Sequence, residues 1–371
     1  MKLSKIGRII VASSAGLAVI LIATLAASPQ IVENPKKPLS PNAGRVVTLK
    51  EVARTTDESG KFFFVQPFAI FAGEDGSIYV QEYKQFLKFD ANGRYLGNLL
   101  KRGEGPGEFN DNLTDVIVRK DDILLCSSNN LKVVRVDLNG NLLEDRRLAQ
   151  TPFMNLLGFR GGRYFLLIWE RKNFPRVSGI YENSFRLVIM PEKGEMVETP
   201  YLMPMTEARR FGPRSVSSSA ISRLTAEWVG DRDVFLFHSP EYLIKHLDLE
   251  TGEIVHSFRR DYDRVKYEHK ASKDYPEELI PKFHNDLCRL LWRNGRLWAV
   301  TSTFDPKKGI LVDVFSREGK YLDNFYLPLF KIRKNNPQYS APMAIHADFL
   351  YVLEADENDL ITLVKYEIGE K

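Results

Sequence analysis

Two neighbouring segments of this 371-residue chain are built on one plan, and a glycine-rich motif joins them. The first segment spans residues 77–100 and the second spans residues 122–148. Each contains an apolar strand, a polar turn, a second strand that ends in Asp, an Asn-Gly turn and a third strand. A strand–turn–strand unit that repeats at about 40–50 residues indicates a modular, all-β architecture in which similar units are arranged side by side.

Five turns that follow a third-strand position carry this repeat along the chain. Glycine and asparagine are favoured there because a hairpin turn needs positive φ angles. These turns contain Gly93, Gly140, Gly194, Gly252 and Gly319. The tail supplies a sixth unit of only three strands, at residues 343–346, 349–354 and 360–368.

Six such units predict a six-bladed β-propeller. A propeller blade normally has four strands, so the sixth unit lacks its outer strand. The segment of residues 45–52 has strand character and can supply it, which closes the ring and removes two open sheet edges. The expected fold is therefore all-β, a six-bladed propeller over residues 45–371 whose ring is closed by an N-terminal strand that completes the last blade.

The first two units resemble those of bacterial six-bladed β-propeller proteins related to NHL-repeat propellers. Gly76–Val80, Phe89–Gly93 and Gly103–Phe109 follow the pattern G-x-I-Y-V, F-D-x-x-G-x and G-x-G-P-G-E-F. The resemblance implies a propeller fold and, because such proteins are mostly exported, a location outside the cytoplasm. Where that pattern commonly has an Asp after its Y-V strand, this chain has Gln81 and Glu82, so no role of that Asp carries over.

The N-terminus has the layout of an export signal. Lys2, Lys5 and Arg8 precede an apolar run over residues 9–27. The run fits either a cleaved signal peptide or a retained transmembrane anchor, and both place the remaining chain in the periplasm or outside the cell. Residues 1–27 are therefore predicted to be this signal or anchor, and the Pro-rich residues 28–44 an extended linker.

Composition limits the function classes. The net charge of +4 is small for a chain of this size, and no recognition-helix or RNA-binding pattern is present, so nucleic acid is not an expected partner. The two cysteines, Cys126 and Cys288, fall in blades on opposite sides of the predicted ring. That separation exceeds the reach of a disulfide, so two free and buried thiols are expected.

A propeller exposes two faces, which we define by their connections. The top carries the second-to-third and the blade-to-blade connections, and the bottom carries the other turns. Three long blade-to-blade connections, at about 203–219, 261–285 and 329–340, are expected on top. Their basic side chains are candidates for binding an anionic ligand such as an acidic glycan. The candidate ligand-binding residues are Arg209, Arg210, Arg214, Lys266, Lys331 and Arg333.

The top mouth of the central channel is the second candidate region. Carboxylates and amides that converge there can hold Ca²⁺, which prefers oxygen ligands; no metal or other cofactor is otherwise expected. Turns favour the same residue types for structural reasons. The channel-mouth candidates are Glu82, Asn129, Glu170, His238, His284, Glu354 and Asp356.

The glycine motif has a structural and a functional interpretation. Gly103, Gly105 and Gly107 can present backbone N–H groups to an anion, but neither a P-loop lysine nor a following helix is present. A tight crossing between blades, fixed by Pro106 and ending in Glu108 and in a Phe109 that plugs the gap, is favoured.

Three function classes remain open. The leading hypothesis is an exported, non-catalytic binding module that recognises an envelope or extracellular ligand, such as an anionic glycan or a protein, through its top loops. The alternative is a metal-assisted lyase, lactonase or hydrolase with its site at the channel mouth, although no nucleophile–base pair is recognisable. A scaffold for protein partners on the bottom or rim is the third.

Overall fold

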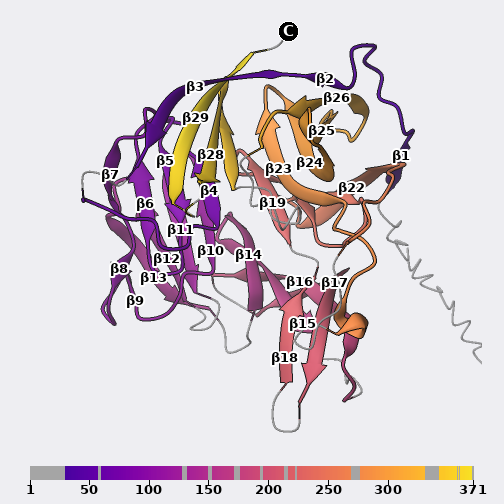
Figure 1. Cartoon of the computed structure of the whole chain (residues 1–371). Helices are drawn as coiled ribbons and strands as arrows, with labels where there is room; N and C mark the ends of the chain where they lie inside the picture. The colour runs from indigo at the N-terminus through magenta and orange to yellow at the C-terminus, as the bar shows by residue number, and fades with distance from the viewer. Residues whose placement is uncertain are drawn as a thin grey trace, which may run out of the picture.

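The computed structural model describes residues 30–56, 60–127, 132–148, 153–170, 176–192, 195–212, 216–221, 224–268, 276–330, 342–356, 358 and 360–369. These residues form six mainly antiparallel sheets arranged in a ring around a central channel (Figure 1). Within each sheet the strand order follows the chain from the channel outwards, except that three sheets end in an outer strand from the N-terminal region. The inner strands of most neighbouring blades contact each other. The predicted ring of six blades is confirmed.

The first three blades follow one another without interruption. Blade one contains β4 (Ala69–Ala72), β5 (Ile78–Gln81), β6 (Phe86–Phe89) and β7 (Tyr95–Asn98). Blade two contains β10 (Asp115–Val118), β11 (Asp122–Ser127), β12 (Lys132–Asp137) and β13 (Leu142–Arg147). Blade three contains β14 (Phe153–Arg160), β15 (Arg163–Glu170), β16 (Gly179–Pro191), β17 (Val197–Phe211) and β18 (Val216–Ala220).

The last three blades each take a strand from the N-terminal region. Blade four contains β19 (Thr225–Val229), β20 (Asp233–Phe237), β21 (Ile244–Asp248), β22 (Glu253–Arg260) and β1 (Ile31–Asn34). Blade five contains β23 (Leu287–Arg293), β24 (Arg296–Asp305), β25 (Gly309–Phe315), β26 (Tyr321–Leu327) and β2 (Arg45–Val46). Blade six contains β27 (Met343–His346), β28 (Phe349–Ala355), β29 (Ile361–Gly369) and β3 (Thr48–Thr55).

Ring closure follows the prediction. Strand β3 pairs antiparallel with β29, from Thr55 opposite Leu363 to Thr48 opposite Gly369, and so forms the outer strand of blade six. The strand begins and ends three residues later than the predicted segment 45–52. The residues before it form β2, which pairs in parallel with β26 of blade five.

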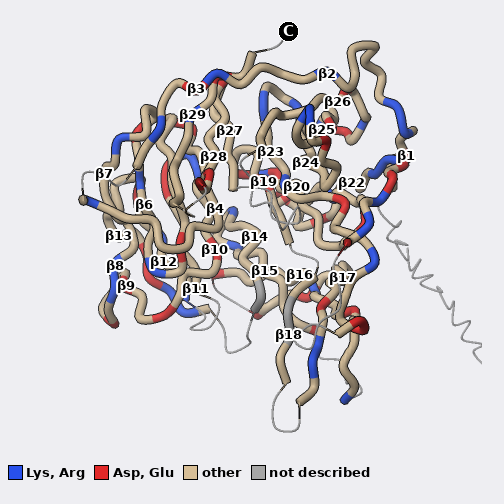
Figure 2. The backbone as a smooth tube through the Cα atoms, in the orientation of Figure 1, with Lys and Arg blue, Asp and Glu red and all other residues tan. Residues whose placement is uncertain are grey.

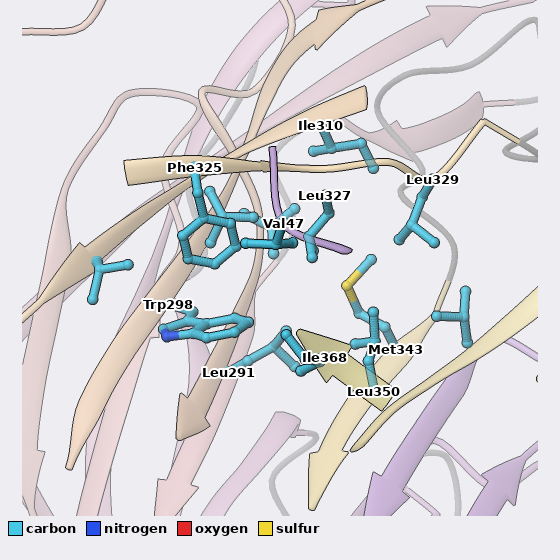
Figure 3. Packing of buried hydrophobic residues seen from close by; sticks show 14 residues of the cluster. Val47, Leu291, Trp298, Ile310, Phe325, Leu327, Leu329, Met343, Leu350 and Ile368 are labelled. Atoms are coloured by element: carbon cyan, nitrogen blue, oxygen red, sulfur yellow. The ribbon is translucent and has the colours of Figure 1, made fainter. Parts of the chain in front are cut away.

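Apolar residues on both sides of each blade build the core. The second strands β5, β11 and β20 are buried at every position, because each blade packs between two neighbours. Figure 3 shows the cluster between blades five and six, where Val47 of the N-terminal region joins Leu327, Met343 and Leu350. Interdigitated side chains between blades, rather than one central core, therefore hold the ring together.

The repeated turn works as its sequence suggests. The Asp90 carboxylate accepts the backbone N–H groups of Asn92 and Arg94, both at 2.9 Å, and Asp137 makes the equivalent bonds in blade two. Gly93 has a φ of +84°, and a Cβ there would lie 2.2 Å from Thr55 Oγ1. Glycine at this position therefore serves both the turn and the contact with the closing strand.

The N-terminal region from residue 30 to residue 55, which we call the strap, runs around the outside of blades four, five and six (Figure 1). Its Pro-rich part, which the sequence predicted to be an extended linker, contains strand β1 and is docked on the ring. Asn34 donates to the carbonyl of Gly319 at 2.8 Å and accepts the N–H of Tyr321 at 2.9 Å. Ser40 and Gly44 donate backbone hydrogen bonds to blade five.

Two predictions need correction. Residues 203–219 are not a loop: β17 and β18 form a hairpin there, and with β16 they project beyond the ring (Figure 1). The β16–β17 ladder continues through Pro204, which lies opposite Ser184. Both cysteines are free, but only Cys126 is buried; Cys288 is partly exposed.

Two small elements complete the described structure. β8 (Lys101–Arg102) and β9 (Glu108–Phe109) form a short parallel pair within the glycine motif. A 3-10 helix, η1 (Glu277–Leu279), lies in the connection between blades four and five. Its Leu279 packs against Ala208 and Ile221 of the projecting hairpin, so these two top-face insertions support each other.

Candidate functional site

The buried carboxylates predicted at the top channel mouth are bound within the protein. Glu82 accepts the N–H of Val65 at 2.9 Å and the side-chain amide of Gln85 at 3.1 Å. Glu354 accepts the Tyr366 hydroxyl at 2.5 Å and the Arg54 guanidinium at 3.2 Å. These hydrogen bonds give both carboxylates a structural role.

Glu170, Asp356 and His238 of this predicted set also have local partners. Glu170 pairs with Arg186, and Asp356 accepts backbone N–H groups in its own turn. His238 is buried with Nδ1 at 2.8 Å from the carbonyl of Pro204, and burial lowers its pKa to about 4. His284 is also buried, which lowers its pKa, and Asn129 lies outside the described residues.

Of the six basic residues predicted on the top face, the three that the structure describes lie on two separate elements. Arg209 pairs with Glu207 and covers the Trp169 ring, with its guanidinium carbon 5.8 Å from the ring centre. Arg210 and Lys266 are exposed on the hairpin and on the connection that follows blade four. Figure 2 shows acidic and basic residues interspersed along both elements. Arg214, Lys331 and Arg333 lie outside the described residues.

The glycine motif satisfies its own backbone. The Glu108 carboxylate accepts the N–H of Gly105 at 2.9 Å, and the N–H of Gly107 donates to Asp145 at 2.6 Å. A Cβ on Gly103 would lie 2.0 Å from the Glu108 carboxylate. Phe109 is buried in the cluster between blades one and two. The contacts fit a blade crossing in which the protein's own carboxylates occupy the N–H groups.

The bottom mouth of the channel, by contrast, is hollow. A cavity of about 360 Å³ opens there, which lies within the size range of small-molecule sites. It is formed where the inner strands of blades one, two, four, five and six end in short turns. The polar and aromatic residues that line it are Glu74, Arg119, Lys120, Glu227, Trp228, Trp292, Arg293, Asn294 and His346.

Glu227 is the most perturbed acid in this cavity. It lies on β19, and its carboxylate accepts the backbone N–H of Trp292 from blade five at 2.8 Å. Burial raises its pKa to about 7, against the opposing effects of this hydrogen bond and of Arg289. A carboxyl group with this pKa is shared between its neutral and charged forms near neutral pH, so it can both donate and accept a hydrogen bond.

A cation lies behind Glu227 in the channel. Arg289 on β23 donates to the carbonyl of Ile70 at 3.2 Å and so connects the inner strands of blades five and one. Burial lowers its pKa, and the charge of Glu227 opposes that shift. Within the described residues Arg289 has no carboxylate within ion-pair distance, so the channel interior carries a weakly compensated positive charge.

Two tryptophans and two paired arginines fix the cavity wall. Trp228 donates its indole N–H to the carbonyl of Leu157 at 2.8 Å, and Trp292 stacks on Phe235 with ring centres 5.6 Å apart. Arg119 forms a two-pronged pair with Asp122, and Arg293 pairs with Asp348 at 2.7 Å. Lys120 is exposed at the rim. The cavity is therefore a rigid, polar pocket with aromatic walls.

The sequence prediction missed this cavity because its residues come from five blades. The available signal was a charged residue within a short apolar inner strand, as with Glu227 in Thr225–Val229 and Arg289 in Leu287–Arg293. Asp115 shows the same signal in β10, and burial raises its pKa to about 6. Charged side chains that face a channel interior mark functional candidates.

Metal ligation and membrane spans were also sought among the described residues. No group of three or more His, Cys, Asp or Glu side chains in that part of the chain is placed to hold a metal ion. No helix in the same residues is long and apolar enough to span a bilayer. The predicted signal or anchor at residues 1–27 lies outside them.

Comparison with known proteins supports the architecture. Residues 70–235, from blade one into β20 of blade four, match the family model DUF5128, which is described as a 6-bladed beta-propeller. The chain is a six-bladed β-propeller. This propeller matches no curated protein. The finer likeness to NHL repeats stays a prediction.

Two solved propellers from Bacteroides are similar in structure. One is a protein of Bacteroides fragilis described as exported, with a TM-score of 0.53, 13% identity and coverage of 92% of this chain and 100% of that chain. The other is a DUF4221 family member from Bacteroides vulgatus, with a TM-score of 0.52, 12% identity and coverage of 88% and 99%. Identities this low show a shared fold alone.

Proposed function

We propose that this propeller is an exported binding module that holds a small hydroxylated ligand, such as a sugar or a sugar acid, in the bottom cavity of its channel. The observation that carries the proposal is the position of Glu227, a carboxyl group with a pKa of about 7 in the wall of a 360 Å³ cavity. Export is supported by the basic and apolar segments that precede residue 28.

The chemistry of the cavity wall selects this ligand class. Hydroxyl groups both donate and accept hydrogen bonds, as does a carboxyl group that is partly protonated. Trp228 and Trp292 offer apolar surface for the C–H face of a ring. Lys120 at the rim can pair with a ligand carboxylate, which extends the class from neutral sugars to sugar acids.

Calorimetric titration of the full-length protein with glucose and with glucuronate tests the proposal. Glu227→Gln keeps an acceptor for the Trp292 N–H but removes the titratable proton, so we expect both sugars to bind about tenfold more weakly. Lys120→Ala should weaken glucuronate more than glucose. Lys84→Ala, an exposed lysine in the top connection of blade one, is the matched control and should change neither.

The outcomes separate the alternatives. Unchanged affinity in Glu227→Gln, or a loss in Lys84→Ala as large as in Lys120→Ala, would contradict a site in this cavity. The full set of titrations is repeated with Ca²⁺ and with EDTA, because a metal-dependent response would support the channel-metal hypothesis that the sequence left open.

The second candidate is an enzyme, and the same carboxyl group favours it. A pKa near 7 suits general acid–base catalysis in a lyase, lactonase or hydrolase. Incubation of the protein with a sugar lactone at pH 7 tests this candidate. Turnover that disappears in Glu227→Gln while the lactone still binds would establish catalysis.

A further inference from the structure

A second cavity lies next to the channel mouth and is distinct from it. It has a volume of about 260 Å³ and sits at the bottom end of blade five, on the side that faces blade six. The turn at Arg293 and Asn294 borders both cavities. The lining residues are Arg45, Arg293, Asn294, Arg296, Trp298, Val314, Asp323 and Phe325.

The charge of this cavity is positive. Three guanidinium groups line it, from Arg45, Arg293 and Arg296, and the carboxylates of Asp323 in the lining and of Asp348 beside it pair with two of them. The formal charge of these five groups is therefore +3 − 2 = +1. Arginine stays protonated at any physiological pH, so this positive charge is permanent.

Two of the three arginines are held in place. Arg45 pairs with Asp323 at 2.7 Å, and its guanidinium carbon lies 5.6 Å from the centre of the Phe325 ring. Arg293 pairs with Asp348 of blade six at 2.7 Å, and its guanidinium carbon lies 5.2 Å from the Trp298 ring. Both cations are oriented before any ligand arrives, which lowers the entropic cost of binding.

The third arginine is available. Arg296 begins β24 and is exposed to solvent, and its guanidinium makes no hydrogen bond or ion pair with any residue that the structure describes. Its five N–H donors form a planar fork that matches carboxylate and phosphate oxygens. An unpaired Arg296 beside two oriented guanidinium groups is the feature that points to an anionic ligand.

The cavity also has an aromatic wall. Trp298 and Phe325 meet edge to face with ring centres 4.7 Å apart, and Figure 3 shows them side by side at one end of the cluster between blades five and six. Val314 extends this apolar wall. These three side chains are at most 5% exposed, so a ligand can reach only the small apolar area at the cavity floor, which an organic substituent would cover and a bare inorganic ion would not.

We propose that this cavity, the arginine pocket, binds a small phosphate monoester. Its phosphate group accepts hydrogen bonds from Arg296 and from the oriented guanidinium groups, and its substituent packs on Trp298 and Phe325. A phosphate monoester carries a charge of about −1.5 to −2 at pH 7, which is opposite in sign to the net +1 of this cluster. Because the strap supplies Arg45, bound ligand also connects β2 to blade five.

Calorimetric titration of the full-length protein with phenyl phosphate tests the proposal. We expect binding that weakens with added salt and is at least tenfold weaker in Arg296→Ala, equivalent to about 1.4 kcal/mol. Arg296→Lys should recover part of the affinity, because it keeps the charge but loses the fork. Arg94→Ala removes an exposed arginine from a bottom turn outside the cavity and serves as the control.

Comparison ligands decide which part of the proposal stands. Phenol, which lacks the phosphate, should not bind, and inorganic phosphate should bind more weakly than the ester. The site would be overturned if Arg296→Ala bound phenyl phosphate as tightly as the wild type does, or if the wild type bound phenol as tightly as phenyl phosphate. Equal affinity for inorganic phosphate would overturn the organic ester. Glu227→Gln should leave phenyl phosphate binding intact, so failure of the channel site and of the arginine pocket can be told apart.

Discussion

The two faces of this propeller reverse the usual relation between loop length and ligand site. The top carries long, charged insertions, yet those that the structure describes pack on each other: Asn285 donates to the carbonyl of Ile221 at 2.8 Å, and Arg264 pairs with Asp286 at 2.9 Å. The bottom carries short turns that leave two cavities open. The polar groups of long loops can bond to one another and so be unavailable to a ligand, whereas short turns leave the mouth of a channel open.

The largest expected effect tests the interlocking of the top face. Asp286 is buried and accepts the Tyr242 N–H and the Arg264 guanidinium, both at 2.9 Å. Asp286→Ala leaves a buried donor and a cation without their acceptor. We therefore expect the free energy of unfolding, measured by urea titration, to fall by about 3 kcal/mol. Asp261→Ala, exposed on the same connection, should change stability by less than about 0.5 kcal/mol. A similar small effect for Asp286→Ala would show that the top face is not interlocked.

The next effect concerns the bottom face and its pH dependence. The folded pKa of Glu227 is raised to about 7 from 4.5, so the unfolded state loses this proton first as pH rises. Its contribution to stability is therefore fully present below pH 4.5 and is lost progressively as pH rises to about 7. We expect this loss to reach about 2 kcal/mol, less than the full shift implies because the side chain is partly exposed.

Urea unfolding at pH 5 and pH 8 measures this loss. Asp115, with a pKa raised to about 6, produces a parallel loss between pH 3.8 and 6. The difference between the wild type and Glu227→Gln therefore isolates Glu227, and the variant should lose less stability between the two pH values. Parallel curves for the two proteins would mean that Glu227 titrates normally and that the bottom cavity does not perturb it.

The smallest expected effect, that of a charge reversal on the top face, tests most directly which face binds ligands. Arg209 and Arg210 lie on β17 of the projecting hairpin and were the leading ligand-binding candidates from sequence. Reversal of the exposed charge in Arg210→Glu should leave glucuronate and phenyl phosphate affinities within about twofold of wild type, since both proposed sites are on the opposite face. A loss comparable with that of Arg296→Ala would move the ligand site to the top.

The fold was predictable because its signals are local. Asp-x-Asn-Gly turns at residues 90–93 and 137–140 and the apolar second strands repeat within about 50 residues. The sixth unit has only three strands in sequence, which showed that the N-terminal strand must supply the fourth. The cavities were not predictable for the opposite reason. The residues that line or approach the cavities can be recognised as site candidates only when the folded ring brings separate blades together, as for Glu227, Arg289 and Arg296. Arg45 reaches its cavity from the strap.

The error over residues 203–219 has a simple cause. Pro204 and the serines that follow Arg214 are typical of a loop, whereas β17 continues through that proline because the residues on both sides of it pair with β16. Tertiary pairing overrode local propensity there. The charged residues that suggested a binding loop belong to a β-hairpin.

The order in which the strap meets the ring has a mechanical consequence. A pull on the chain from residue 30, such as a tether at residues 9–27 would transmit, reaches β1 on blade four first and β2 on blade five second. β3, which closes the ring, bears that load only after both have detached. The two short parallel pairings thus act as sacrificial attachments in series, and a force can strip them from blades four and five while the sixth blade still has all four of its strands.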